Sequence, residues 1–265
     1  MSTCRVVRMV LIVLPAIAFA SWAAAADAAP LETAGPKSAA APDEQAAQAA
    51  LTRLGAKFEL DWRGRALGVE LEGPKVDDAA LSHLIKLSVL ETLDVGKSGI
   101  SDAGLAYLRS KTALHRLYLH DNGVTDAGLF NLRHLLGLEV LSLQDTKIAG
   151  AGLVYLRGLK ALRVLNLSHT KVTDDSLAFL AGLTNLDTLA LEDTRITGAG
   201  LRQLKPLAQL RVLNLNNCSV RDADLADLVG HEALRMLYLK GCKVSDEAVE
   251  QFKAKMTSLA IYTFE

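Results

Sequence analysis

LRVLNLSHTKVTDDSLAFLAGLTN, residues 162–185, begins with six letters that return unchanged at residues 210–215. The text between them, LDTLALEDTRITGAGLRQLKPLAQ (residues 186–209), carries its leucines at the same places. Written in rows of 24, residues 66–257 align as eight rows without a gap. Self-similarity at a fixed period of this length predicts a solenoid of stacked repeats.

The spacing within one row predicts what each part of the repeat forms. Position one denotes the first residue of each row, at 66, 90, 114, 138, 162, 186, 210 and 234. Apolar residues at positions four and six alternate with polar neighbours, which is the period of a strand with one buried face. Positions sixteen, nineteen and usually twenty-two are also apolar, as expected for the inner stripe of a short helix. One row cannot bury its own leucines, so successive rows must stack.

The consensus LxxLxLxxTxVTDxGLxxLxxL resembles the leucine-rich repeat family, most closely its bacterial 24-residue type, which is related to the cysteine-containing repeats. This resemblance implies an α/β right-handed horseshoe, with parallel strands on the concave face and short helices on the convex face. It also implies binding of other macromolecules on the concave face. Departures from the consensus put local helix packing in doubt; they are Gly150, Gly198, Lys111, His231 and Lys255.

Two features at the start of each expected helix have a predicted role. A hydroxyl residue followed by an acid, such as Thr125-Asp126, is expected to cap the free amides and to interact favourably with the helix dipole. A glycine precedes the first helical leucine in several rows, and we expect its small size to let the helix approach the strand layer. These glycines are Gly104, Gly128, Gly152 and Gly200.

The segments outside the rows predict export and capping. Arg5 and Arg8 precede a short apolar run and a string of small residues, so residues 1–26 are predicted to be a secretory signal peptide, with an uncleaved anchor as the alternative. Residues 27–42 are rich in Ala and Pro and are predicted to be a flexible linker. Residues 43–65 are expected to form a capping helix and hairpin, and residues 258–265 a capping strand. The mature protein is therefore expected to be secreted or periplasmic, without a stable membrane span.

Composition excludes several classes of function. The chain of 265 residues has 29 basic and 30 acidic side chains, so it lacks the basic excess of a nucleic-acid binder. Three cysteines are too few for a disulfide framework or a four-cysteine zinc site. Cys218 and Cys242 share position nine of consecutive rows, where a disulfide is possible, but parallel side chains favour two packed thiols. No cofactor is predicted.

The candidate ligand-binding residues lie at positions three, five, seven and eight, where strand side chains point outward or strands end. The protein is predicted to be a non-enzymatic binder of a protein or peptide, with a cell-envelope glycan as a second ligand class. A structural envelope protein without a dedicated ligand is the alternative. The candidate contacts are Arg116, Tyr118, His120, Asp121, Gln144, Asp145, Asn166, His169, Glu192, Asn214 and Tyr238.

Hydrolysis is the third hypothesis. Adjacent strands are about 4.8 Å apart, so Asp121 and Asp145 are expected to be neighbours with a separation that acid–base chemistry could use. His120 and His169 are two rows apart, about 10 Å, which is too far to share one metal ion. No nucleophile motif, metal-helix signature or phosphate loop occurs in the sequence. An open sheet also excludes water poorly, so catalysis and a metal site are not expected.

Overall fold

The structure is a computed structural model that describes residues 40–256 and 259–263. All of these residues lie in one compact unit. The predicted signal peptide and nearly all of the predicted linker lie outside the described residues, so both stay predictions. Within the described part of the chain, no helix combines the length and the apolar composition that crossing a membrane requires.

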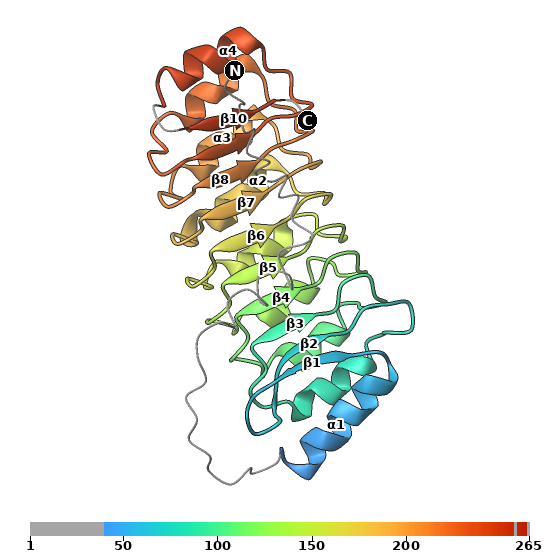
Figure 1. The fold of residues 1–265 in the computed structure, drawn as a ribbon. Helices are drawn as coiled ribbons and strands as arrows, with labels where there is room; N and C mark the ends of the chain where they lie inside the picture. Colours follow the sequence, from blue (N-terminus) through green and yellow to red (C-terminus); the bar gives the residue numbers. More distant parts are fainter. Residues whose placement is uncertain (1–39, 257–258, 264–265) are drawn as a thin grey trace, which may run out of the picture. The chain divides into compact units, whose positions relative to one another are not determined.

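A ten-stranded sheet runs through this unit in sequence order, β1 to β10 (Figure 1). The first two strands pair antiparallel, and every later strand is parallel to its predecessor. Three consecutive residues of each strand from β2 to β9 pair with the residues 24 positions later, as Leu117 pairs with Leu141 and Leu141 with Leu165. The strands are β1 (Lys57–Leu60), β2 (Ala66–Glu70), β3 (Thr92–Asp94), β4 (Arg116–Tyr118), β5 (Val140–Ser142), β6 (Val164–Asn166), β7 (Thr188–Ala190), β8 (Val212–Asn214), β9 (Met236–Tyr238) and β10 (Ala260–Tyr262).

The helical part of most repeats is a 3₁₀-helix. Leucines spaced by three residues suit a helix with three residues per turn, in which side chains at i and i+3 eclipse. The 3₁₀ segments are η2 (Ala80–Lys86), η3 (Gly104–Leu108), η4 (Gly128–Leu132), η5 (Ala151–Leu156), η6 (Ala178–Gly182), η7 (Arg202–Leu204) and η8 (Asp222–Leu228). The α-helices are α1 (Pro42–Arg53), α2 (Asp174–Leu177), α3 (Gly198–Leu201) and α4 (Asp246–Lys253). The predicted α/β repeat solenoid is confirmed.

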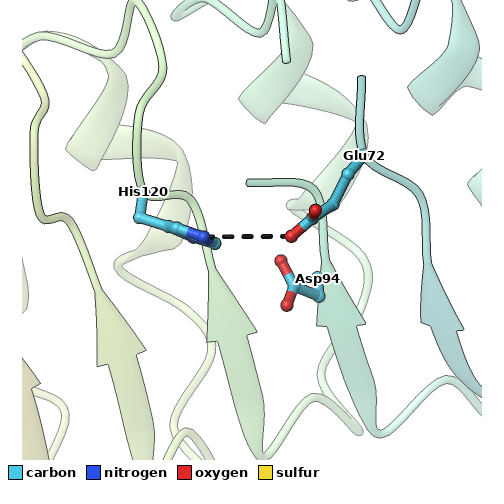
Figure 2. A group of neighbouring side chains, drawn as sticks. All are labelled: Glu72, Asp94 and His120. Atoms are coloured by element: carbon cyan, nitrogen blue, oxygen red, sulfur yellow. Dashed lines mark ion pairs between the residues drawn. The ribbon is translucent and has the colours of Figure 1, made fainter. Parts of the chain in front are cut away.

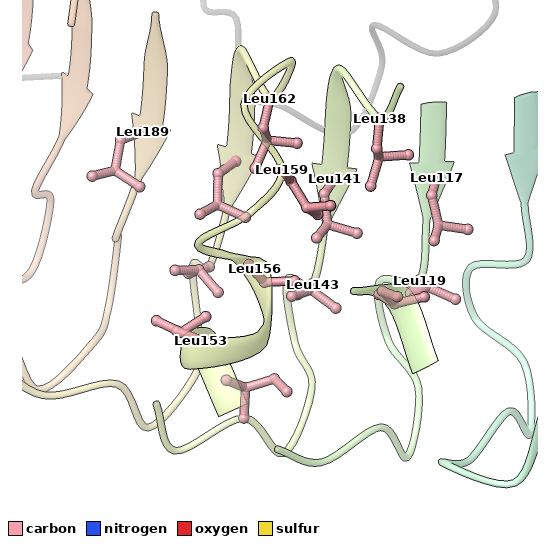
Figure 3. Packing of buried hydrophobic residues seen from close by; sticks show 14 of the residues in the cluster. Leu117, Leu119, Leu138, Leu141, Leu143, Leu153, Leu156, Leu159, Leu162 and Leu189 are labelled. Carbon is pink, nitrogen blue, oxygen red and sulfur yellow. The ribbon is translucent and has the colours of Figure 1, made fainter. Parts of the chain in front are cut away.

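One continuous apolar core lies between the strands and the helices (Figure 3). Leu117, Leu141 and Leu189 at position four are completely buried, as are the helical leucines Leu153 and Leu156. Burying a leucine side chain contributes about 1.5–3 kcal/mol, and each of these side chains packs against residues of neighbouring repeats. Stacking therefore supplies the burial that one repeat cannot supply alone.

The acid before the helix has a role that the sequence analysis did not predict. Its carboxylate reaches the next repeat, where it accepts hydrogen bonds from the backbone amide and the hydroxyl of the hydroxyl residue. Asp102, for example, accepts from Thr125 N at 2.8 Å and from Thr125 Oγ1 at 2.6 Å. The same contact joins Asp78 to Ser101, Asp174 to Thr197 and Asp222 to Ser245. The acid joins consecutive repeats, in addition to any interaction with the helix dipole.

The helix-start glycines make room for a different neighbour from the predicted strand layer. A β-carbon at Gly104, Gly128 or Gly200 would overlap the aspartate of the preceding repeat, and at Gly152 it would overlap the backbone of Asp126. The missing side chain therefore makes room for the aspartate contact between repeats.

Capping by the hydroxyl residues is confirmed at several repeats. Thr197 accepts a hydrogen bond from Ala199 N, and Ser245 accepts one from Ala248 N. Thr173, however, makes no such side-chain contact.

The residues that replace leucine at position twenty-two are accommodated differently. Lys111 is buried, and its Nζ donates to the carbonyl oxygens of Ile85 and Leu87, both at 2.9 Å. His231 is buried too, but its Nε2 has no hydrogen-bond partner in the part of the chain that the structure describes. Burial, followed by the nearby charge of Lys205, lowers the pKa of His231. The lysine is thus hydrogen bonded, whereas the histidine is left unsatisfied.

Candidate binding surface

The side of the sheet that faces away from the helices carries the predicted contact residues. We call it the sheet face and define it by positions three, five, seven and eight of the repeats. Its exposed side chains at strand starts and ends include Arg116, Asp121, Asp145 and His169. Tyr118, His120, Gln144, Glu192, Asn214 and Tyr238 are half-buried, and Asn166 is buried. The predicted contact residues therefore lie on one face, but their side chains differ widely in exposure to solvent.

Asparagine at position five holds the sheet face together instead of projecting from it. The Oδ1 of Asn166 accepts from Ser168 N, and its Nδ2 donates to Gln144 Oε1 of the preceding repeat, both at 3.0 Å. Asn214 repeats this arrangement, with its Nδ2 donating to Glu192 Oε2 at 3.0 Å. Four predicted contact residues are thus paired in two bridges between repeats. Such bridges pre-order the surface and leave little of Asn166 for a partner.

Position eight has a backbone constraint that the sequence analysis missed. Its non-glycine residues all have left-handed backbone angles, including φ of 55° at Asp121, 52° at Asp145 and 57° at His169. Asp, Asn and His tolerate this conformation better than other side-chain-bearing residues. The remaining residues at this position are Gly73, Lys97, Asp193, Asn217 and Gly241. The composition of this column could have revealed the turn, and it explains the acids there without any catalytic role.

A strip of aliphatic side chains lies at position three of β5, β6, β8 and β9, interrupted by Thr188 of β7. Val140, Val164 and Val212 are half-buried, and Met236 is 36% exposed. At the C-terminal end the Tyr238 and Tyr262 rings stack, with centroids 4.7 Å apart. The sheet face therefore combines apolar and aromatic surface with the polar groups of positions seven and eight.

The two sheet-face histidines that the sequence analysis compared have separate acidic partners. His169 Nδ1 lies 3.3 Å from Asp193 Oδ2. His120 Nε2 lies 3.9 Å from Glu72 Oε1, and Asp94 completes a group whose ligand atoms all lie within 4.8 Å of one another (Figure 2). The sequence analysis missed this group. The sequence feature that could have revealed this group is Gly96 at position seven. A β-carbon there would overlap the His120 ring.

Cys218 and Cys242, the cysteines among the described residues, are unbridged thiols. The Cys218 and Cys242 Sγ atoms donate to the carbonyl oxygens of Leu191 and Leu215 respectively, each at 3.1 Å. Burial raises the pKa of both thiols. A buried thiol with a raised pKa is a poor nucleophile, so neither side chain has the environment of a reactive cysteine.

Comparison with known proteins agrees with this geometry. A family model described as "Leucine Rich repeat" matches residues 86–108 and 159–181. The search of curated proteins found no match. Among solved structures, an internalin C2 from Listeria monocytogenes is similar with a TM-score of 0.65 and 22% sequence identity, over 84% of this chain and 93% of that one. At this identity the likeness concerns the fold. The family matches at two rows, the stacked 24-residue rows and the fold together identify leucine-rich repeats in this chain.

Proposed function

We propose that this protein is an exported, non-enzymatic binding protein that recognises a protein or peptide on the sheet face, the face expected to be concave. The observation that carries the proposal is the aliphatic strip at position three beside rows of polar groups. An apolar centre with a polar border is typical of protein interfaces. A cell-envelope location is supported by the signal-peptide pattern at residues 1–26.

Recognition is expected to depend on a few side chains. Tyr and Arg are over-represented among residues that dominate binding energy, and Arg116 and Tyr118 occupy neighbouring outward positions of β4. His120, His169 and Glu192 supply hydrogen-bonding and charged groups along the strand ends. Because the Asn166 and Asn214 bridges already order this surface, binding costs less conformational entropy than it would on a mobile loop.

The charge of the strand ends indicates the chemistry of the partner. Four acids are exposed there, Glu72, Asp121, Asp145 and Asp193, against one exposed lysine, Lys97. We infer that the partner carries lysine or arginine side chains facing these acids. Contacts between exposed charges weaken as salt rises, since screening shortens their range to about 8 Å at physiological ionic strength.

The hydrolytic alternative has less support. Asp121 and Asp145 are exposed at turns that require left-handed residues, and Gln144 donates to Asp145 Oδ2 at 2.9 Å. Acid–base catalysis gains from a site that excludes water, and these carboxylates lie in the open. A glycan ligand and a purely structural role are outcomes of the following test.

The test is capture of a partner from cell-envelope extract, followed by affinity measurement with the purified partner. Combined Tyr118→Ala and His169→Ala substitutions should weaken binding at least about tenfold, because truncating a dominant interface residue costs about 2 kcal/mol or more. Tyr155→Ala on the helix side is the matched control and should leave affinity unchanged. Equal affinity of both variants for the partner would place binding elsewhere. Capture of a glycan would favour the second ligand class.

A further inference from the structure

Position five of the sheet face carries an asparagine in two bridged repeats and an aspartate in another repeat. At position five, Asn166 and Asn214 each accept a hydrogen bond from the amide two residues later and donate to position seven of the preceding repeat. Asp94 occupies the same position, and its Oδ1 accepts from Gly96 N at 3.0 Å. Its neighbour at position seven of the preceding repeat is Glu72. The donor–acceptor bridge of the two asparagines is therefore replaced by two carboxylates.

Two facing carboxylates repel each other, and the group beside them that can carry a positive charge is the His120 imidazole. Asp94 is 5% exposed, so water screens its charge poorly. Within residues 40–256 and 259–263, neither Glu72 nor Asp94 forms a salt bridge with a lysine or arginine; the Lys57 ammonium instead bonds Glu70 Oε1 at 2.6 Å. Burial chiefly raises the pKa of Asp94, the Gly96 amide and His120 lower it, and Glu72 and Glu70 add smaller raising effects. Two carboxylates and an imidazole thus face one another, an arrangement that a bound cation would stabilise.

The third donor reaches this pair from two repeats away. His120 is on the third repeat and Glu72 on the first, but the intervening residue at position seven is Gly96. The His120 ring occupies the space that a side chain at this position would fill, so that its Nε2 faces Glu72 (Figure 2). The backbone of His120 is held by its carbonyl oxygen, which accepts from Lys97 N at 2.9 Å.

We propose that Glu72, Asp94 and His120 form a binding site for a divalent first-row transition cation of the zinc class. Imidazole nitrogen with two carboxylate oxygens is a donor set that suits such ions, and three protein ligands leave a coordination position for water or a group of a partner. Metal–ligand bonds of about 2.0–2.2 Å require the three donor atoms to draw closer by about 1 Å. Rotation of the exposed Glu72 side chain supplies most of this movement.

Zinc titration of the tag-free protein, followed by calorimetry and thermal unfolding, tests the site. The wild type should bind one Zn²⁺ with a rise in Tm, and excess Mg²⁺ should not compete. Asp94→Asn recreates the amide–carboxylate bridge of Asn214 and Glu192, so the metal-free variant should be at least as stable as the wild type. It should nevertheless bind Zn²⁺ at least about tenfold more weakly, since even partners outside the ligand set change metal affinity by about 10–100-fold.

Gly96→Ala is the sharper variant, because it keeps all three ligands and only displaces the His120 ring. It should also lose Zn²⁺ affinity. Gly158→Ala, where an added β-carbon meets nothing within 4 Å, and His169→Ala, which removes the other acid-paired histidine, should both bind like the wild type.

Two results would overturn the proposal. Equal Zn²⁺ affinity of the wild type, Asp94→Asn and Gly96→Ala would place the ion elsewhere, for example on the thiols. Absence of Zn²⁺ binding by the wild type, with Asp94→Asn still more stable, would mean that a shared proton relieves the two carboxylates.

Discussion

The contact between repeats predicts that substitutions at Asp102 and Gly128 have non-additive effects on the free energy of unfolding. Asp102→Ala removes two hydrogen bonds to a charged acceptor, at 2.8 Å and 2.6 Å from Thr125. Such bonds contribute about 1.5–3 kcal/mol each, and partial exposure of Asp102 to solvent reduces this. We expect the free energy of unfolding to fall by about 2–3 kcal/mol.

Gly128→Ala should disturb the same contact from the other side. An added β-carbon overlaps Asp102 Oδ1 and comes within 3.0 Å of the Leu105 Cδ1 methyl. We expect a loss of about 1–3 kcal/mol, the usual cost of overpacking. In the Asp102→Ala background only the Leu105 contact is left, so the second substitution should cost at least about 1 kcal/mol less than it does alone.

Urea unfolding of the wild type, both single variants and the double variant measures this coupling. Gly158→Ala serves as the control, because its added β-carbon has no neighbour within 4 Å, and its stability should change by no more than about 1 kcal/mol. Additivity of Asp102→Ala and Gly128→Ala within about 0.5 kcal/mol would refute the explanation of this glycine.

Two further predictions concern the core. Leu141→Ala should lower the free energy of unfolding by about 2–5 kcal/mol, because Leu141 is 0% exposed and its loss leaves a cavity shared with the neighbouring repeats; a loss under about 1 kcal/mol in urea unfolding would contradict the shared core. His231→Leu should stabilise the protein by about 1–3 kcal/mol at pH 8, because it removes an unsatisfied buried nitrogen. Since burial lowers the folded-state pKa of His231 below 6.5, the unfolded chain binds more protons in acid and wild-type stability falls as pH falls through this range. The advantage of His231→Leu should therefore grow between pH 7 and pH 5, and a constant or shrinking advantage would contradict the assigned burial.

The fold could be predicted from sequence because the buried positions repeat without insertion. Positions four and six predict a strand, and a strand of this kind has one register when every neighbour has the same pattern. The role of Asp102 could not be predicted in the same way. Its carboxylate contacts a residue 23 positions later, and row alignment alone does not show which way a side chain turns.

The candidate site was less predictable than the fold. Outward positions such as Arg116 follow directly from the strand period, but the burial of Asn166 depends on its bridge to Gln144. The sequence analysis assessed His120 as a metal ligand only from the spacing between strands, which sets the distances between backbones. The His120 ring reaches Glu72 because Gly96, which lies between them, has no side chain. Spacing between strands alone does not reveal this contact.

The central claim, that the sheet face of the stacked repeats contacts the partner, is tested most directly by site-specific photo-crosslinking. A crosslinker is placed at Arg116 on the sheet face in one variant and at Tyr155 on the helix side in another, and the adducts formed with the captured partner are identified by mass spectrometry. We predict a partner adduct from position 116 and none from position 155. Adducts only from position 155, or a crosslink from position 116 to residues 1–39 of the same chain, would contradict a free sheet face.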